Sequence, residues 1–330
     1  MNAVVFDGRL KVQERPRPCI AGGESLIRLL KAGICNTDIE IIRGYFGFRG
    51  VLGHEFVGVV EASRNPSLVG KRVVGEINAS CGQCDYCRKG LGRHCPKRTV
   101  LGILGRDGAF QDFFLLPEEN LHVLPESISD EAAVFVEPLA AACEIMDQVR
   151  IQPADHVAVL GDGKLGLLVT MVLCQTGCSL VLMGRHLTKM KLMKNLNVET
   201  VLEDAVGREE HCFDFVVEAT GSPRGWEQSL RWVKPRGTII LKSTFHGALA
   251  FNPAPLVVDE ITVVGSRCGR FDAALGLIQE QRIDPTVLLQ YRFPLKEAVE
   301  AFEAAQKPGV LKVILSNAGD GQEALNPAHS

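Results

Sequence analysis

Three residues near the start of the chain have side chains that could hold a metal ion together. Cys35, His54 and Glu55 supply a thiolate, an imidazole and a carboxylate within the stretch from Gly33 to Glu55. Catalytic zinc prefers these ligand types and keeps one position open for water or substrate. The alternative is that Cys35 and His54 are ordinary buried side chains with satisfied polar groups. The ligand set favours a catalytic zinc site whose remaining ligand comes from elsewhere in the chain.

A second group of cysteines has the spacing of metal ligands. Cys81, Cys84, Cys87 and Cys95 follow the pattern C-x2-C-x2-C-x7-C in a loop that contains glycine. Four thiolates at short spacing predict a closed tetrahedral zinc site, which is structural because no ligand position is open. An iron–sulfur cluster is the competing interpretation, since thiolates also hold such clusters.

Composition limits the class of protein. The chain has 330 residues, of which 46% are hydrophobic and 23% charged, with a net charge of −3. These values indicate a globular protein of about two domains, with no basic character for nucleic acid. We see no signal peptide and no apolar run long enough for a membrane span. Eleven cysteines without a secretory signal favour metal binding in a reducing compartment, so we expect a cytoplasmic protein.

The pattern of apolar residues changes along the chain. The front third predicts strands, at 3–6, 10–14, 25–31, 57–62 and 72–77, with a short helix at 36–43. From residue 156 onward short apolar strands alternate with helices, which predicts a parallel sheet covered on both faces. In this part we expect strands at 157–160, 179–183, 213–218 and 238–241, and helices at 167–176, 188–196 and 225–233.

A glycine-rich turn opens the alternating part. Gly161, Asp162, Gly163, Lys164, Leu165 and Gly166 fit G-x-G-x-x-G between an apolar strand and an apolar helix. The first glycine permits the turn, the second lets the backbone approach a pyrophosphate, and the third allows the helix to pack on the strand. The start of the helix also offers unpaired N–H groups to the anion. A plain strand-to-helix turn is the alternative, but this context favours dinucleotide binding.

The end of the next strand bears on which dinucleotide binds. Gly184, Arg185 and His186 follow strand 179–183, with no carboxylate among them. NAD-binding proteins place an acid here to hold the ribose hydroxyls, whereas an arginine accommodates the 2′-phosphate of NADP. We therefore expect NADP, with NAD the outcome if Arg185 is only a solvated surface residue.

Taken together, these motifs resemble the zinc-dependent medium-chain dehydrogenase/reductase family, which includes alcohol, sorbitol, threonine and glucose dehydrogenases. The matching segments are 33–38, 53–58, the cysteine loop, 137–140, 161–166 and 217–221, which follow the family's order over residues 25–315. The resemblance implies an α/β protein with a GroES-like β-rich catalytic domain (1–138 and 268–330, zinc lobe 80–96). It also implies an inserted Rossmann domain (139–267) with a doubly wound parallel sheet.

The resemblance also implies roles around the catalytic zinc. Glu137 would join Cys35 and His54 as a ligand, with Glu55 beside the metal and ligating in some states. Asp38 would accept the other N–H of His54 and fix its tautomer. Thr37 would contact the substrate hydroxyl and start the proton path.

Two further sets of positions complete the expected site. The family often has histidine five positions after the zinc cysteine, and this chain has Glu40, which can relay protons or bind substrate hydroxyls. The resemblance implies that Ala219, Thr220, Gly221 and Ser266 contact the cofactor. It places Lys312 near the coenzyme, paired with Glu55 or the pyrophosphate.

The chemistry implied is zinc-assisted hydride transfer. Zinc lowers the pKa of an alcohol, which then gives a hydride to the nicotinamide. We expect two zinc ions per chain, a small alcohol or carbonyl substrate (a secondary alcohol, polyol or sugar), and a homodimer or homotetramer. The alternatives are an NAD-linked dehydrogenase of a ring or polyketide-like hydroxyl, or a catalytically silent dinucleotide-binding protein.

Overall fold

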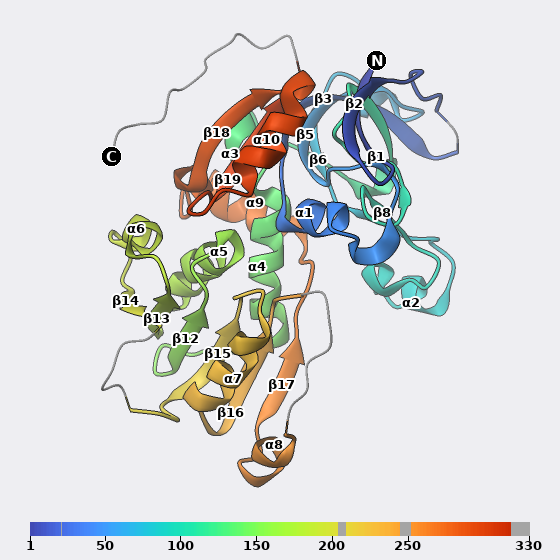
Figure 1. Ribbon diagram of the computed structural model, residues 1–330. Coiled ribbons are helices and arrows are strands. Elements are labelled where there is room, and N and C mark those ends of the chain that lie inside the picture. Colours follow the sequence, from blue (N-terminus) through green and yellow to red (C-terminus); the bar gives the residue numbers. More distant parts are fainter. Residues whose placement is uncertain (21, 204–208, 245–251, 318–330) are drawn as a thin grey trace. The chain divides into compact units, whose positions relative to one another are not determined.

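The computed structural model describes residues 1–20, 22–203, 209–244 and 252–317 (Figure 1). The chain forms two compact units: a first unit of Met1–Glu137 with Ala274–Ser330, and a second unit of Pro138–Ala273. The second boundary falls inside helix α9 (Phe271–Gln279), later than residue 267 where the resemblance places it.

A seven-stranded sheet forms the centre of the first unit. Its order is β11-β6-β5-β3-β19-β18, with β10 also paired to β3. The strands are β3 (Glu24–Gly33), β5 (Glu55–Ala62), β6 (Arg72–Gly75), β10 (Phe113–Pro117), β11 (Leu121–Val123), β18 (Leu289–Pro294) and β19 (Lys312–Ser316). Strand β19 pairs antiparallel with β3 and parallel with β18, so the C-terminal segment extends a sheet begun by the first third of the chain.

Two small sheets use strands that alternate along the chain with those of the large sheet. They have the orders β2-β1-β4 and β7-β8-β9. Their strands are β1 (Asn2–Phe6), β2 (Leu10–Glu14), β4 (Gly50–Val51), β7 (Asn78–Ala79), β8 (Thr99–Leu101) and β9 (Gly105–Arg106). Edge-to-face aromatic pairs contribute to the core of this unit: Phe56 lies 4.7 Å from Phe114, and Phe110 lies 6.0 Å from Phe302.

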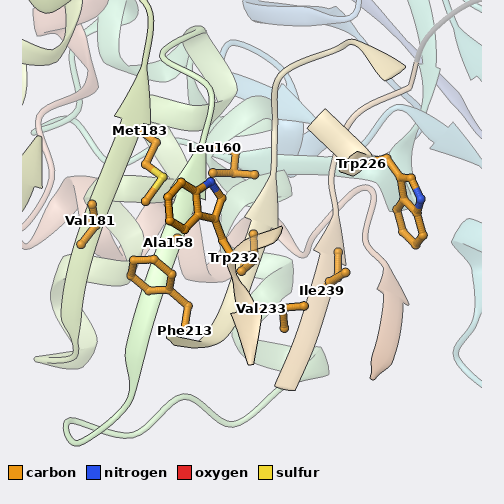
Figure 2. Packing of buried hydrophobic residues seen from close by; sticks show 10 residues of the cluster. Ala158, Leu160, Val181, Met183, Phe213, Trp226, Trp232, Val233 and Ile239 are labelled. Atoms are coloured by element: carbon orange, nitrogen blue, oxygen red, sulfur yellow. The ribbon is translucent and has the colours of Figure 1, made fainter. Parts of the chain in front are cut away.

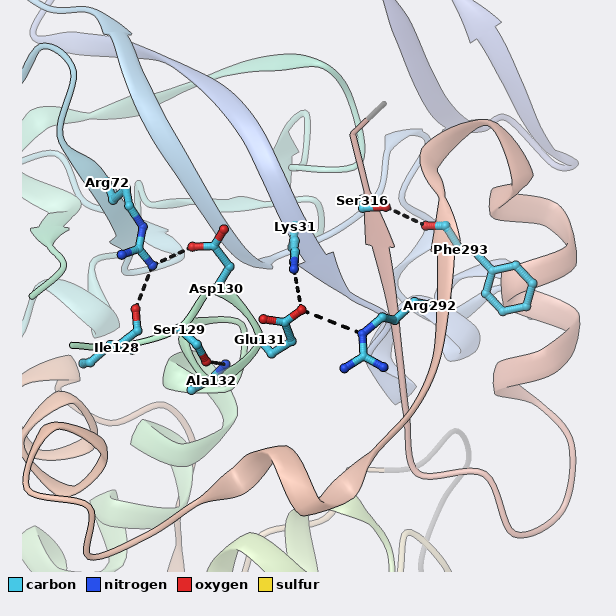
Figure 3. Close-up of polar contacts among 10 residues, drawn as sticks. All are labelled: Lys31, Arg72, Ile128, Ser129, Asp130, Glu131, Ala132, Arg292, Phe293 and Ser316. Carbon is cyan, nitrogen blue, oxygen red and sulfur yellow. Dashed lines mark hydrogen bonds and ion pairs between the residues drawn. The ribbon is translucent and has the colours of Figure 1, made fainter. Parts of the chain in front are cut away.

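The first unit also contains short helices. They are α1 (Asn36–Ile42), α2 (Asp85–Arg88), α3 (Asp130–Ala133) and α10 (Ala298–Ala305). Helix α3 begins after Ser129, whose hydroxyl accepts from the N–H of Ala132 at 3.2 Å, a standard N-cap. Figure 3 shows that α3 is also held by ion pairs to β6, β3 and β18.

A six-stranded parallel sheet forms the second unit. Its order is β14-β13-β12-β15-β16-β17, which in chain order is third, second, first, fourth, fifth, sixth, the doubly wound order of dinucleotide-binding domains. The strands are β12 (His156–Leu160), β13 (Ser179–Gly184), β14 (Glu199–Leu202), β15 (Phe213–Glu218), β16 (Val233–Leu241) and β17 (Thr262–Gly265).

The helices of this part of the chain differ in their bounds from the prediction. They are α4 (Val136–Gln148, which begins two residues before the second unit), α5 (Lys164–Leu173), α6 (Leu187–Met190), α7 (Pro223–Trp232) and α8 (Ala254–Val258). Helix α5 starts three residues earlier than predicted, at the glycine turn itself, and residues 174–176 form a 3-10 turn. The helix predicted at 188–196 is only α6 followed by a 3-10 turn at 191–193.

Tryptophan and phenylalanine side chains fill one part of the second unit's core (Figure 2). Trp232, at the end of α7, packs edge-to-face on Phe213 with ring centroids 6.4 Å apart. Ala158 and Leu160 of the first strand belong to the same buried cluster. This packing supports the sheet below the glycine turn. Of the helices in the described ranges, none is both long and apolar enough to cross a membrane.

Candidate functional site

The side chains of Cys35, His54 and Glu55 come together in the first unit. One ligand atom from each lies within 4.8 Å of the other two, and His54 and Glu55 are buried. Cys35 caps helix α1, and Glu55 begins strand β5, so two different elements bring the ligands together. Atoms this close can surround one ion after small adjustments, because zinc–ligand bonds are about 2.0–2.3 Å long.

Asp38 connects the two segments that carry these ligands. This carboxylate is fully buried, and it accepts from the N–H of Cys35 at 2.9 Å and from the N–H of Gly53 at 3.2 Å. Its Oδ1 also lies 3.4 Å from Nδ1 of His54, longer than a good hydrogen bond. In metal sites, a carboxylate outside the ligand set fixes the tautomer and ring orientation of a histidine ligand. Asp38 faces His54 in the position for this role.

The imidazole of His54 lies between two negative groups. Burial lowers its pKa, but the charges of Asp38 and Cys35 raise it more, so that the pKa lies well above the ordinary value. A cation would therefore be favoured at this place. Within the described residues, Nδ1 of His54 has no hydrogen bond of good geometry, because the nearest acceptor, Oδ1 of Asp38, is 3.4 Å away.

Glu55 is also paired with a lysine. Lys312 of β19 donates to Oε2 of Glu55, and both side chains are 1% exposed. Gly33 permits this approach, because a first side-chain carbon there would lie 2.5 Å from Oε2 of Glu55 and 2.7 Å from Val134. Lys312 also lies 5.3 Å from the ring of Phe135. The carboxylate of Glu55 is thus shared between a fixed lysine and the metal-ligand cluster.

Other predicted residues lie near this cluster or outside it. The hydroxyl of Thr37 is 3.7 Å from the sulfur of Cys35. Glu40 is on helix α1, where it pairs with Arg43 at 3.0 Å. Glu137 is half-buried in the first turn of α4 and is not part of the group within 4.8 Å. Its role as a zinc ligand stays a prediction.

The four cysteines of the second set form a compact group. Their sulfurs lie 3.4 Å (Cys84–Cys87), 3.5 Å (Cys81–Cys95), 3.7 Å (Cys84–Cys95) and 4.0 Å (Cys81–Cys87) apart. A regular tetrahedron with edges of about 3.7 Å has its centre about 2.3 Å from each corner, which is the Zn–S bond length. The donor set therefore fits one tetrahedral metal ion, and a multi-iron cluster would need more room between the sulfurs.

The glycine turn of the second unit follows strand β12. Gly161 adopts φ +112°, which favours glycine, and a first side-chain carbon there would lie 2.6 Å from the carbonyl oxygen of Ala219. Gly166 likewise allows the start of helix α5 to approach Gly161. The turn lies where the strand order reverses, between β12 and β15, which is where such sheets bind their ligands. Ala219, Thr220 and Gly221 follow β15 at the same edge.

The segment after strand β13 contacts this turn directly. The carboxylate of Asp162 accepts from the backbone N–H of Arg185 at 2.8 Å and of His186 at 2.6 Å. It also contacts the ring of His186 at 3.0 Å. The side chain of Arg185 is exposed. Three predicted cofactor residues, Asp162, Arg185 and His186, thus form one hydrogen-bonded group.

One charged residue in the second unit was missed in the sequence. Lys242 is 7% exposed, directly after β16, and it donates to the carbonyls of Ala141 at 2.5 Å and Arg267 at 2.9 Å and to the hydroxyl of Ser266 at 3.1 Å. It therefore holds the segment that includes Ser266, a predicted cofactor residue. The signal was a single lysine at the end of an apolar strand, a place where charge is unusual.

Two family models match the chain. The model for the alcohol dehydrogenase GroES-like domain matches residues 21–126, and the model for zinc-binding dehydrogenase matches residues 165–280. The first region contains Cys35, His54 and the four clustered cysteines, and the second begins at the last two residues of the glycine turn.

Proteins of known name are similar over nearly the whole chain. Sorbitol dehydrogenase of Halalkalibacterium halodurans is 28% identical over 94% of this chain and 96% of its own. Alcohol dehydrogenase TADH from Thermus sp. ATN1 is 30% identical, with a TM-score of 0.88 over 96% of this chain and 99% of its own. A zinc-binding dehydrogenase from Sinorhizobium meliloti 1021, solved bound to NADP, is 26% identical, with a TM-score of 0.86 over 96% and 98%.

Proposed function

Because this chain belongs to the zinc-dependent medium-chain dehydrogenase family, we propose that it transfers a hydride between NADP(H) and a secondary alcohol, polyol or sugar. The observation that carries this proposal is the grouping of Cys35, His54 and Glu55, with ligand atoms within 4.8 Å. The separate set of four cysteines would form a closed structural site, so we assign the catalytic role to the first set. Thiolate, imidazole and carboxylate are the ligands of a catalytic zinc.

Each residue of the cluster has its own part in the proposal. Cys35 and His54 would hold the metal, with Glu137 as the third ligand and Glu55 alternating between Lys312 and the metal. Bound there, zinc supplies Lewis acidity that lowers the pKa of an alcohol hydroxyl. Thr37, beside the sulfur of Cys35, would accept the hydroxyl proton and pass it outward. Asp38 would keep the ring of His54 in one tautomer.

The polyol part of the proposal rests on the relatives. The sorbitol dehydrogenase similar to this chain acts, by its name, on a polyol. Glu40 on helix α1 lies five positions after Cys35, and a carboxylate can accept hydrogen bonds from several substrate hydroxyls. We therefore propose a polyol as the substrate in preference to a simple alcohol.

The choice of NADP rests on the charge after strand β13. Arg185 is exposed at the carboxyl end of that strand, where an acid would bind the ribose of NAD. A guanidinium pairs with a phosphate, often through two hydrogen bonds. The similar dehydrogenase from Sinorhizobium meliloti was solved with NADP, which agrees with this choice.

A panel of polyols, sugars and secondary alcohols, assayed with NADP and with NAD, tests the proposal. The expected result is reduction of the dinucleotide by at least one polyol, with a larger kcat/KM for NADP. An equal or larger value with NAD would replace the cofactor and favour the NAD-linked alternative. Cofactor binding without turnover of any substrate, in a protein with only one zinc per chain, would favour the catalytically silent alternative.

We also propose that the chain forms a homodimer or homotetramer in the cytoplasm. Strand β17 is at the edge of the six-stranded sheet, and Val263 on it is 38% exposed. Val257 and Val258 of helix α8 are 75% and 77% exposed. An open strand edge beside exposed valines is a surface that a second copy can cover. None of the eleven cysteines, all of which lie in the described ranges, is in a disulfide bond; proteins of a reducing compartment rarely contain disulfides.

A further inference from the structure

Asp162 is a buried carboxylate inside the glycine turn. It occupies the first variable position of the motif Gly161–Gly166, and it is only 5% exposed. The motif itself requires no acid there, because its three glycines make the turn and the approach to the pyrophosphate. A negative charge so close to an anion-binding turn also weakens the attraction for phosphate. Its presence therefore has to be explained by what it contacts.

The carboxylate of Asp162 contacts the segment directly after strand β13. One oxygen, Oδ2, accepts from the backbone N–H groups of Arg185 and His186, at 2.8 and 2.6 Å, and lies 3.0 Å from Nδ1 of His186. The other oxygen lies 3.2 Å from the same ring nitrogen. Two consecutive N–H groups and one ring thus converge on a single carboxylate, which fixes the direction in which the chain leaves the strand.

Asp162 also restricts what can stand at the end of the strand. A first side-chain carbon on Gly184 would lie 2.6 Å from Cβ and 2.8 Å from Cγ and Oδ2 of Asp162. Real side chains do not approach so closely, so the carboxylate and a residue larger than glycine exclude each other. An acid that binds the ribose of NAD would be placed at this strand end. Asp162 occupies that space and directs its own oxygens to backbone and imidazole.

We propose that Asp162 determines the cofactor preference as a positioning residue. By holding the backbone of Arg185 and His186, it presents the guanidinium to the 2′-phosphate of NADP, and by occupying the space beside Gly184 it keeps an acid out. This inference rests on the proposed NADP function. It adds Asp162 as the residue that orients Arg185 toward the 2′-phosphate.

Binding of nucleotide fragments separates positioning from general support of the turn. The adenosine fragments 2′,5′-ADP and 5′-AMP differ only in the 2′-phosphate, and calorimetry gives both dissociation constants without turnover. The variants are D162A, D162N, R185A and D162A/R185A. The matched control is D214N, because Asp214 also accepts from a backbone N–H (His156, 2.9 Å) in the same unit, but at the amino ends of the strands.

The expected result is a selective loss. D162A should weaken 2′,5′-ADP about tenfold, a loss typical of removing charge-assisted hydrogen bonds, and 5′-AMP by less than about threefold. D162N, which keeps one acceptor oxygen, should lie between wild type and D162A, and D214N should leave the ratio unchanged. The double variant should lose little more than R185A alone, because Asp162 acts through Arg185. The ratio of kcat/KM for NADP over NAD should fall in parallel.

Three results would overturn the inference. Equal weakening of both fragments by D162A and D162N would make Asp162 a general support of the turn. Tighter binding of 2′,5′-ADP to D162A would mean that the carboxylate mainly repels the phosphate. Additive losses in the double variant would make the two residues independent. If instead the wild-type protein binds 2′,5′-ADP no more tightly than 5′-AMP, the NADP part of the proposed function itself fails.

Discussion

Asp38 lies between Cys35 and Gly53, and its two oxygens accept from both backbones. The segments that carry two of the proposed zinc ligands therefore share one buried carboxylate. Because the third contact is to His54 at 3.4 Å, Asp38 affects both the spacing of the ligands and the orientation of the imidazole. Residues in this position around metal sites change affinity or activity without contacting the metal.

Replacing Asp38 by asparagine should reduce activity more than stability. D38N keeps one acceptor oxygen but loses the charge beside His54, so kcat/KM should fall by about 10–100-fold, with weaker zinc binding. The control is D112N, because Asp112 accepts from the N–H of Asn2 at 2.7 Å in the same unit. Steady-state kinetics and metal analysis measure the effect, and wild-type values for D38N would contradict the role given to Asp38.

Among the groups beside the metal-ligand cluster, the buried ion pair of Glu55 and Lys312 should contribute most to the stability of the fold. K312M removes the partner of the Glu55 carboxylate, which is only 1% exposed. The free energy of unfolding should therefore fall by about 3–5 kcal/mol. The double variant E55Q/K312M should recover part of this loss, because the unpaired charge is gone.

Urea unfolding of metal-free protein measures these differences. The comparison variant is K11M, whose pair with Asp7 is exposed (side chains 44% and 50%) and should contribute little to the free energy of unfolding. If K312M were as stable as K11M, the buried pair would not have the importance given to it.

Single residues could be predicted from the sequence only in part. The thiolate, imidazole and carboxylate types were visible, and so were the four clustered cysteines. The partner of Lys312 was left open between Glu55 and the pyrophosphate, because the two residues are separated by 257 positions. The contacts of Asp162 with Arg185 and His186 were not visible either, since they form only once β12 and β13 lie side by side.

At the scale of elements, helix α3 connects three strands of the first unit (Figure 3). Arg72 of β6 donates to Asp130 at 2.5 Å, while Glu131 pairs with Lys31 of β3 and with Arg292 of β18 at 3.7 Å. The helix is only four residues long, so its position depends on these pairs more than on its own backbone hydrogen bonds. The segment with Glu137 follows directly.

The ion pairs of Glu131 predict a pH dependence of stability. Burial raises the pKa of Glu131, but the cations Lys31 and Arg292 lower it more, so its pKa in the folded protein is below the ordinary value. Its contribution is therefore complete above the unfolded pKa of about 4.3 and is lost as the pH falls through the lower folded pKa.

E131Q should remove this contribution. Near neutral pH the variant should be less stable by about 1 kcal/mol, and the difference from wild type should disappear in acid. Thermal unfolding between neutral and acid pH measures it. A constant difference at every pH would show that the loss comes from packing and not from charge.

The strands of the second unit show which elements the apolar pattern of the sequence could predict. The apolar strands β12, β13, β15 and β16 and the glycine turn were predictable, because buried parallel strands are continuous apolar runs. Strand β14 was missed, since Glu199 and Thr200 begin it and it lies at the sheet edge, where polar residues are tolerated. Helix α6 is shorter than predicted. The apolar spacing at 188–196 indicated a helix but not the residue at which it ends.

At the scale of the whole molecule, the order of matched segments made the two-part fold predictable. The front third and the C-terminal strands form one sheet, which no local pattern indicates; it followed from the resemblance. The family models and the similar structures support the same fold. The choice of substrate is different, because it depends on a few side chains and not on the fold.

Association of two copies should depend on the open edge at β17. Introducing charge at the exposed valines, as V257D/V258D, should shift a dimer towards monomers, because desolvating two carboxylates in an apolar contact is costly. The control is V287D, since Val287 is 45% exposed in the first unit. Sedimentation velocity measures the change, and a double variant that associates as well as V287D would place the interface elsewhere.

The central claim is that the chain holds two different zinc ions, one catalytic and one structural. The most direct measurement follows zinc content and activity together while the protein is dialysed against a chelator. We predict about two zinc ions per chain at the start. The ion at Cys35 and His54, with mixed ligands, should leave first and take the activity with it, while the ion at the four cysteines stays and the fold persists. Loss of both ions together, or full activity after the first ion has left, would contradict this account.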